Sequence, residues 1–308
     1  MPGAYAHITL VNLAKEPHRL EAGPGMAGSA ISVLMDWFKY CELGAVSPDY
    51  PYLAPPLTNQ ARWADLMHYE RTGDMIKVGI AAVRKLAGEE KRRAFAWLLG
   101  YTAHVITDVT IHPVVELKVG PYAENKKAHR ICEMNQDAYI FQRLKLGDIG
   151  LSEHLDSGIR KCTLPGSNDL DPIIVAVWQD MLTACHPDAF TAGEAKISLW
   201  HAGFGNTVDL AEEGNRLFPL ARHVAIDQGL TYPTVNEINR DAYINDLAVP
   251  GGRLSYDQVF DKAIRHVIEG WHLVAKGVFE DDALYQTTFA QWNLDTGKDP
   301  TGRVVLWS

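Results

Sequence analysis

The strongest constraint on the fold is a long apolar segment that carries three ligand-type side chains in register. Residues 94–115 read AFAWLLGYTAHVITDVTIHPVV, and a helix this apolar belongs in a protein interior. His104, Asp108 and His112 follow one another at intervals of four, which places them along one helical face. An unpaired buried charge is costly, so this face needs partner side chains or a cation. Because Pro113 disfavours helical backbone at the residue before it, we expect the helix to end at His112.

The rest of the chain predicts a mainly helical protein. Apolar residues recur at helical spacing in several further segments: 26–42, 59–70, 74–87, 89–112, 124–145, 171–186, 193–215 and 255–279. The proline-rich segment 47–56 is expected to be a turn, and residues 226–254 read as irregular. The last residues accommodate a turn and a short strand, RVVLW. With no βαβ alternation and no glycine-rich phosphate loop, the predicted fold class is all-α.

Five further histidines and carboxylates occupy positions that suit metal ligands. His129 and Glu133 share a helical face at i, i+4, although such a pair alone is most often a solvated ion pair. Asp49 lies in the proline-rich turn, His68 in the helical segment RWADLMHYE, and His7 near the start. Imidazole nitrogen and carboxylate oxygen without thiolate suit catalytic zinc. Together with the apolar helix this makes eight groups, enough for a cluster in which one carboxylate bridges two metals.

Charge and cysteine usage limit the partners and the compartment. The formal net charge is −9, so no stable nucleic-acid complex is expected. The four cysteines have no CxxC spacing and are expected to be free thiols in a reducing compartment. No signal peptide and no run of 18 apolar residues occur, which favours a cytoplasmic location without a membrane span and leaves leaderless export open. The oligomeric state is not predicted.

The sequence lacks the motifs of other hydrolase and metalloprotein classes. The HD-type phosphohydrolases require an adjacent His-Asp pair, and serine hydrolases favour G-x-S-x-G; neither occurs. A di-iron bundle needs two E-x-x-H motifs, and we find only Glu269 with His272.

The order of the candidate ligands resembles the zinc-dependent phospholipase C and S1/P1 nuclease superfamily. An early His, an Asp in a proline-rich turn, a helical His, and then His-Asp-His and His-Glu on helices follow the family's order over residues 1–145, continuing to about 190. The resemblance implies a multi-helix fold with a catalytic domain over 1–190. It further implies a helical C-terminal extension over 191–308 packed on that domain, and about two to three zinc ions.

The resemblance also implies a role for each candidate ligand. Asp49, His68, His104 and Asp108 would surround a first zinc, and Asp108 would bridge to a second zinc that also takes His7. Asp49 and Asp108 are the candidate catalytic residues. The residue that matches Asp49 is a general base in the phospholipase branch and a ligand in the nuclease branch, so both roles stay open.

The remaining zinc would be held by His112, His129 and Glu133. Two departures from the family concern this cluster. The motif P-G-x-x-x-H resembles the family's W-G-x-x-x-H, with Pro2 in place of a tryptophan whose free amine binds metal; the Pro2 amine is free only if Met1 is removed. The secreted enzymes place five residues between the bridging Asp and the next His, and this chain places three.

The expected function is hydrolysis of a phosphate ester or phosphodiester by zinc-activated water, of phospholipase C type, with phospholipid as a candidate substrate. A nuclease or nucleotidase of the same chemistry and a catalytically silent metal-binding interaction protein are the alternatives. Tyr50, Tyr52 and Trp63 are candidates for an aromatic pocket that takes a cationic headgroup or a base. Asp65 and Asp137 are candidates for orienting the histidines.

Overall fold

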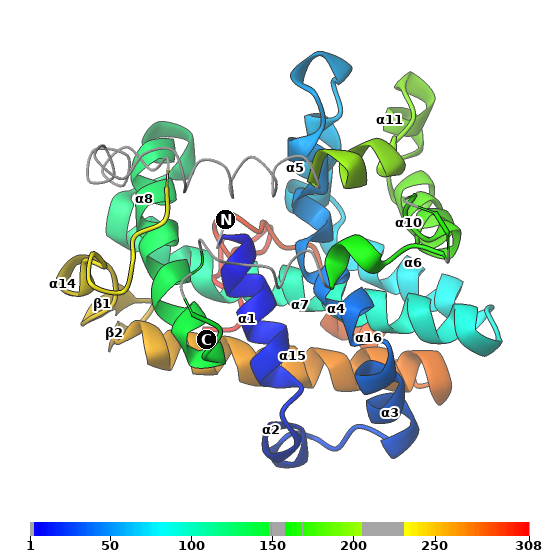
Figure 1. Cartoon of the computed structure of the whole chain (residues 1–308), viewed down its shortest axis with the longest axis horizontal. Coiled ribbons are helices and arrows are strands. Elements are labelled where there is room, and N and C mark those ends of the chain that lie inside the picture. Colours follow the sequence, from blue (N-terminus) through cyan, green and yellow to red (C-terminus); the bar gives the residue numbers. More distant parts are fainter. Residues whose placement is uncertain are drawn as a thin grey trace.

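One long helix, α7 (Gly88–Val119), runs through the middle of the molecule, and the other helices pack around it (Figure 1). The computed structural model describes residues 3–147, 149, 158–164, 166, 167, 169–204 and 231–307. Ahead of α7 the chain forms α1 (Ala4–Ala14), α2 (Pro17–Ala22), α3 (Gly28–Asp36), α4 (Phe38–Val46), η1 (Ser47–Leu53), η2 (Pro56–Thr58), α5 (Ala61–Tyr69) and α6 (Thr72–Arg84). After α7 it forms α8 (Tyr122–Phe141), η3 (Gln142–Leu144), η5 (Ile159–Lys161), α10 (Pro172–Cys185), α11 (Pro187–Ala192), α14 (Arg240–Tyr243), β1 (Leu247–Val249), β2 (Gly252–Leu254), α15 (Tyr256–Phe279) and α16 (Tyr285–Thr288). The predicted all-α class is confirmed.

The central helix is longer than the sequence predicts. Two acidic residues in its first turn favour the start of α7, and Gly120, at φ 87°, ends it. Between these ends α7 continues through Pro113, so the expected end at His112 is wrong. A proline inside a helix removes one hydrogen bond and costs about 3 kcal/mol. Residues 94–115 are buried throughout, and this burial outweighs that local cost.

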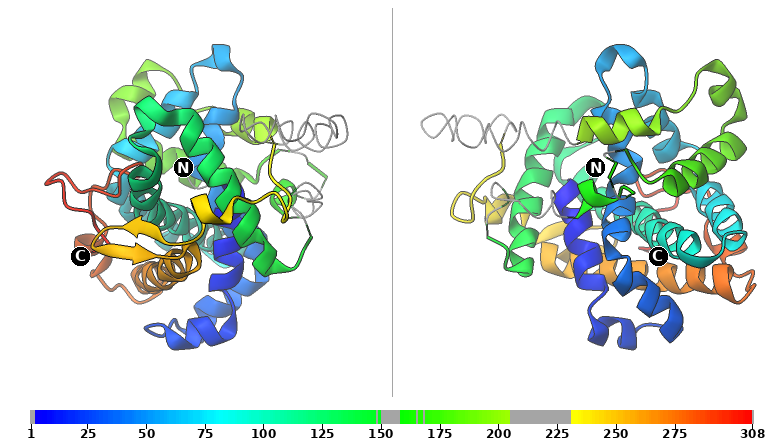
Figure 2. Two further views of the ribbon diagram at one scale, coloured as in Figure 1. Left: turned by 90° about the vertical axis from the view of Figure 1, so that its left-hand side faces the viewer. Right: turned by 45° about the vertical axis from the view of Figure 1, so that its right-hand side comes forward.

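Two helices pack directly on α7 through specific contacts. Gly44 of α4 and Gly100 of α7 let the backbones approach closely, since a Cβ on Gly44 would lie 2.0 Å from the Trp97 carbonyl oxygen. The indole Nε1 of Trp271 in α15 donates to the carbonyl of Leu99 at 2.8 Å. Helix α15 agrees with the predicted helix 255–279, and the two views of Figure 2 show it running alongside the central helix. The division into domains at residue 190 stays a prediction.

Three local predictions were wrong in detail. The expected helix 26–42 is broken at Trp37, where non-helical backbone at φ −117° separates α3 from α4. The proline-rich segment, expected as a turn, forms the 3-10 helix η1, with Pro48 in the first turn, where its missing N–H costs no hydrogen bond, and Pro51 inside the helix. The RVVLW strand is absent from the described residues, where only an isolated bridge joins Lys298 to Val304, and Leu306 has φ 63°.

Two further predicted segments lie in the C-terminal half of the chain. The irregular region 226–254 contains an antiparallel hairpin, β1 with β2, turned at Gly251 with φ 87°. This hairpin lies at one end of the molecule, in contact with α7 and α15 (Figure 2). Within the predicted helix 193–215, residues 197–204 are helical, and residues 205–215 lie outside the described part of the chain.

The interior is apolar and contains the expected thiols. The four cysteines are buried and free, as predicted, and the reducing compartment stays a prediction. Helix α7 is long and apolar enough to cross a membrane, and its most apolar stretch is 100% buried inside the fold, as in the core helix of a globular protein. The polar groups on that buried helix therefore need hydrogen-bond partners or cations inside the protein, because burying them unpaired costs free energy.

Candidate metal centre

Four segments that are distant in the sequence bring five of the predicted ligands together. His7 comes from α1, Asp49 from η1, His68 from α5, and His104 and Asp108 from α7. The side chains of all but Asp49 are fully buried, and the Asp49 side chain is 20% exposed. Two overlapping sets, His7 with His104 and Asp108, and Asp49 with His68 and His104, have their ligand atoms within 4.8 Å of one another.

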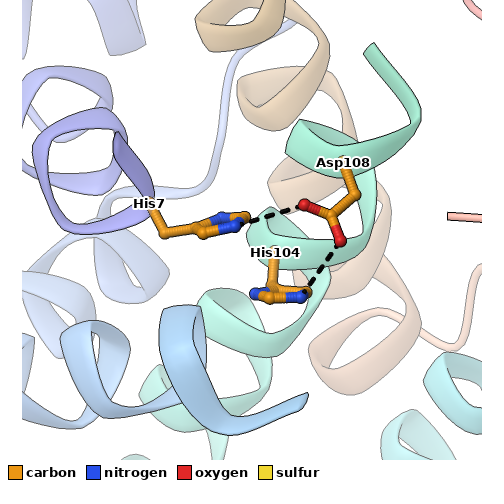
Figure 3. A group of neighbouring side chains, drawn as sticks. All are labelled: His7, His104 and Asp108. Atoms are coloured by element: carbon orange, nitrogen blue, oxygen red, sulfur yellow. Dashed lines mark ion pairs between the residues drawn. The ribbon is translucent and has the colours of Figure 1, made fainter. Parts of the chain in front are cut away.

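The two oxygens of Asp108 face different histidines (Figure 3). Oδ1 lies 3.2 Å from Nε2 of His7, whereas Oδ2 lies 3.2 Å from Nε2 of His104 and 3.7 Å from Nε2 of His68. The His7 ring stacks on the His104 ring with centroids 4.1 Å apart. A carboxylate placed between two sets of imidazoles in this way is suited to bridge two cations.

The Nε2 atoms of the His68 and His104 rings point at one another. Nδ1 of His68 lies 2.7 Å from the carbonyl of Ala64, and Nδ1 of His104 lies 2.8 Å from that of Ala45. A carbonyl only accepts, so both Nδ1 atoms carry the hydrogen and both Nε2 atoms of the neutral rings present lone pairs. These Nε2 atoms are 3.4 Å apart. Two facing lone pairs require a cation between them, either a proton on one ring or a metal ion.

The charges within the cluster depend strongly on one another. Burial disfavours the charged form of His104, but the carboxylates of Asp108 and Asp49 outweigh it and raise its pKa to about 9. Burial also opposes the charge on Asp108, yet His104 and His112 hold its pKa well below the usual value. Burial and the charge on His104 lower the pKa of His7. Without a metal ion, the site therefore retains one shared proton on His104.

The remaining predicted ligands lie further along α7 and on α8. His112 is buried and donates from Nδ1 to the carbonyl of Leu294, and burial lowers its pKa to about 4. His129 donates from Nε2 to the carbonyl of Gly120 at 2.6 Å, and its Nδ1 lies 3.8 Å from Oε1 of Glu133. His112, His129 and Glu133 do not form a group with ligand atoms within 4.8 Å in the described part of the chain. Their assignment to a third zinc stays a prediction.

The start of α1 explains the glycine in the P-G-x-x-x-H motif. Asp137 of α8 is fully buried and accepts from the backbone N–H of Ala6 at 3.1 Å, so its carboxyl caps the helix that carries His7. A Cβ on Gly3 would lie 1.9 Å from Oδ2 of Asp137. Burial and the charge of Glu133 raise the pKa of Asp137 to about 8. The carboxyl of Asp137 accepts from Ala6 and from the hydroxyl of Tyr232, and it positions His7 through the backbone of α1.

The aromatic residues near the site divide into core and surface. Tyr50 and Trp63 are fully buried in the core, so neither presents a surface to substrate. Tyr52 is 37% exposed, and its hydroxyl donates to Asp65 at 2.8 Å. Of the predicted aromatic pocket only Tyr52 is placed to meet a ligand. Asp65 pairs with this tyrosine and not with a histidine.

Several residues that complete the centre could not be found from the sequence. Backbone carbonyls of Ala45, Ala64 and Leu294 orient three of the histidines, and a carbonyl leaves no mark in a sequence. Asp295 accepts from the hydroxyl of Tyr69 at 2.6 Å and lies close enough to His112 to affect its pKa. Asp295 is more than 180 residues from His112 in the sequence, so the sequence could not show that the two lie close together.

The nitrogen and oxygen atoms of the site are better suited to bind zinc than to form hydrogen bonds with one another. Buried polar atoms without a hydrogen-bond partner include both ring nitrogens of His7, both carboxylate oxygens of Asp108, Nε2 of His112 and Nδ1 of His129. The unpartnered atoms of His7 and Asp108 lie in one buried cluster, which is unusual for a stable protein unless a cation binds them. Nitrogen and oxygen donors without thiolate are the set that catalytic zinc takes.

Comparison with known proteins agrees with this donor set. The family described as zinc dependent phospholipase C matches residues 6–188, a range that includes all the predicted ligands. No curated protein and no solved structure matches the chain. The match covers more than half of the chain and begins beside the histidine of α1. On this evidence the chain belongs to the zinc-dependent phospholipase C family.

Proposed function

We propose that this protein hydrolyses a phosphodiester bond of a phospholipid at a zinc cluster centred on Asp108. The observation that carries the proposal is the pair of Nε2 lone pairs of His68 and His104, 3.4 Å apart and flanked by Asp49 and Asp108. Membership of the family supports a zinc-dependent hydrolase in general.

The protein's own groups have distinct tasks in this proposal. When bound, zinc supplies hydroxide at neutral pH and neutralises charge on the phosphoryl oxygens. His104 belongs to both ligand sets, and Asp108 lies between His7 and His104, so these two residues would be ligands shared by neighbouring ions. Asp49 is the ligand with an exposed edge, with its Oδ1 3.4 Å from Nε2 of His68. It is therefore placed to orient the attacking water and to accept its proton.

The surroundings favour a substrate with local negative charge only at the phosphate. The chain carries a net charge of −9, which repels a polyanion outside the immediate field of bound zinc. Around the site, Asp65 and Asp295 add carboxylates, each bonded to a tyrosine hydroxyl. These features favour a lipid phosphodiester over a nucleic-acid backbone.

The first test measures zinc-dependent hydrolysis with a matched pair of variants. The wild-type protein, loaded with zinc, is expected to release phosphorylated headgroup from phosphatidylcholine vesicles. Asp108→Asn removes the bridging charge and is expected to lower the rate at least about 1,000-fold and to reduce bound zinc. Asp180→Asn, on the exposed face of α10, is the control and should change neither quantity.

Each other result assigns a different function. Cleavage of single-stranded nucleic acid without cleavage of lipid would identify a nuclease with the same chemistry. Full zinc occupancy without hydrolysis of either substrate would identify a metal-binding protein without turnover. An Asp108→Asn variant with unchanged zinc stoichiometry would contradict the bridging role of this carboxylate.

A further inference from the structure

The segment that follows α16, residues 289–305, forms a strap over one side of the candidate metal centre, and we name it the C-terminal strap. It lies outside the range matched by the family. Backbone N–H of Leu294 donates to the carbonyl of His68 at 3.0 Å. The side-chain amide of Gln291 donates to the carbonyl of Tyr69 at 2.8 Å. The strap is thus tied to the end of the helix that supplies His68.

A second attachment fixes the strap at the start of α6. Thr72 and Trp292 exchange two hydrogen bonds of 2.9 Å, one through the Trp292 carbonyl and one through its N–H. The Thr72 side chain is fully buried. With the bonds to α5, this attachment determines where the Leu294 carbonyl points.

On its other side the strap lies against α7 at the proline inside that helix. Gly297 has φ 64°, and a Cβ added there would lie 2.5 Å from both the Val109 carbonyl oxygen and Cγ of Pro113. This close approach needs glycine for space as well as for backbone conformation. Lys298 beside it lies 3.9 Å from Glu116 of α7. The strap therefore bridges α5 and α7, the two helices that supply His68, His104 and Asp108.

The bond that matters chemically joins the strap to His112. Nδ1 of His112 donates to the carbonyl of Leu294, and the ring is 1% exposed. Because a carbonyl only accepts, the hydrogen of the neutral ring is fixed on Nδ1. Nε2, which is buried and has no hydrogen-bond partner, then carries a free lone pair. Such a partner also fixes the ring orientation and strengthens the ring as a donor.

We propose that the C-terminal strap is a positioning element of the metal centre, which holds His112 in the Nδ1–H tautomer so that Nε2 is the metal donor. This inference deepens the proposed function and rests on it for the statement that His112 binds zinc. The tautomer of His112 is set by the Leu294 carbonyl and does not depend on a metal ion. Displacing the strap should leave the ring free to protonate at Nε2 and weaken the zinc held by His112.

The test displaces the strap with one methyl group. Gly297→Ala adds a Cβ against α7, and Gly302→Ala is the matched control, because Gly302 also has positive φ (85°) but no atom within 4 Å of the added Cβ. Both full-length proteins are labelled with ¹⁵N-histidine, stripped of metal and compared with wild type by long-range ¹H–¹⁵N correlation spectra. His112→Gln identifies the His112 signals. Zinc affinity is then measured by titration against a competing chelator.

We expect wild type and Gly302→Ala to show His112 protonated at Nδ1 alone. Gly297→Ala should show a mixed tautomer and bind one zinc at least about tenfold more weakly, a factor that corresponds to about 1.4 kcal/mol. If Gly297→Ala fails to fold, Gln291→Leu removes the bond to Tyr69 at the other attachment and should show the same mixed tautomer.

Two results would overturn the inference. One is a wild-type protein whose His112 is protonated at Nε2. The other is a Gly297→Ala protein, or its substitute Gln291→Leu, that keeps both the wild-type tautomer and the wild-type affinity. Failure of the proposed function looks different: wild type would bind no zinc or hydrolyse nothing, while the tautomer would still depend on the strap.

Discussion

At the residue scale, the candidate centre depends on which nitrogen of each imidazole carries the hydrogen. His68 and His104 bond backbone carbonyls through Nδ1 and turn Nε2 towards Asp108. The sequence predicted that His104 and Asp108 share a face, because their spacing of four follows from helix geometry. It did not predict the tautomers, because these are set by carbonyls whose position depends on how distant helices pack.

Zinc affinity should rise with pH. The pKa of His104 is raised to about 9, so below that pH zinc must displace its proton. Affinity is therefore expected to increase about tenfold per pH unit for this proton between pH 7 and 9, with a plateau above it. Chelator-competition titrations at several pH values measure the slope. An affinity that is flat over this range would show that His104 is not protonated in the metal-free site.

The proton on His104 weakens zinc binding, but it stabilises the metal-free fold. A histidine whose pKa is raised above the unfolded value of 6.5 stabilises the folded state below that value. The contribution of His104 is lost as the pH rises through about 9. Urea unfolding of the metal-free protein at pH 6 and pH 9, with His104→Gln as the comparison, isolates this contribution.

His129→Ala should remove one metal and leave the others. Its free Nδ1 faces Glu133 on α8, apart from the two ligand sets around Asp108. Elemental analysis counts the ions in the variant and in His18→Ala, whose side chain is 72% exposed and serves as the control. Loss of every ion from His129→Ala would mean that the proposed sites form cooperatively and cannot be assigned one by one.

At the element scale, the crossing of α4 and α7 places a carbonyl against His104. A Cβ on Gly100 would lie 1.9 Å from the Cys41 carbonyl oxygen, and Gly44 is equally tight. This contact brings the carbonyl of Ala45 to Nδ1 of His104. The glycine pair thus serves the site as well as the core.

Gly100→Ala should therefore both destabilise the fold and weaken zinc binding. Overpacking between two backbones typically costs about 1–3 kcal/mol or more. Gly28→Ala, in α3 with no atom within 4 Å of the added Cβ, is the matched control. Urea unfolding and zinc titration check both parts. A Gly100→Ala protein as stable as Gly28→Ala would show that the helices separate without cost.

The elements divide clearly into those the sequence could predict and those it could not. Helices α7 and α15 carry a helical apolar pattern, which local periodicity detects. The passage of α7 through Pro113 follows from tertiary burial, which overrides the local rule. The β1–β2 hairpin is too short for its alternation to be recognised, with three residues in each strand. The C-terminal strap has no regular pattern, and its role depends on contacts with residues more than 180 positions away.

At the scale of the whole molecule, the candidate metal centre is part of the core. Asp108 and four of the predicted histidine ligands are buried on or against the central helix, so removal of the cation leaves several polar atoms unpartnered. A ligand that binds only the folded state stabilises it by about 4 kcal/mol at 1,000 times its Kd.

Strong chelation should therefore lower the melting temperature by about 8 °C, since 1 kcal/mol shifts Tm by about 2 °C in a domain of this size. Readdition of zinc should restore it, and readdition of magnesium should not, because magnesium prefers oxygen donors. Calorimetry with and without chelator measures the shift. An unchanged melting temperature would indicate that the buried cluster is satisfied by protons alone.

We infer that a metal ion, and not a proton, occupies the space between His68, His104 and Asp108. The most direct measurement is an anomalous difference map, recorded at the zinc edge from crystals of the full chain grown with zinc. Our account predicts one peak bounded by Asp49, His68, His104 and Asp108 and a second between His7 and Asp108. A map without peaks at these positions, in a protein whose imidazole nitrogens are instead bonded to protein groups, would contradict it.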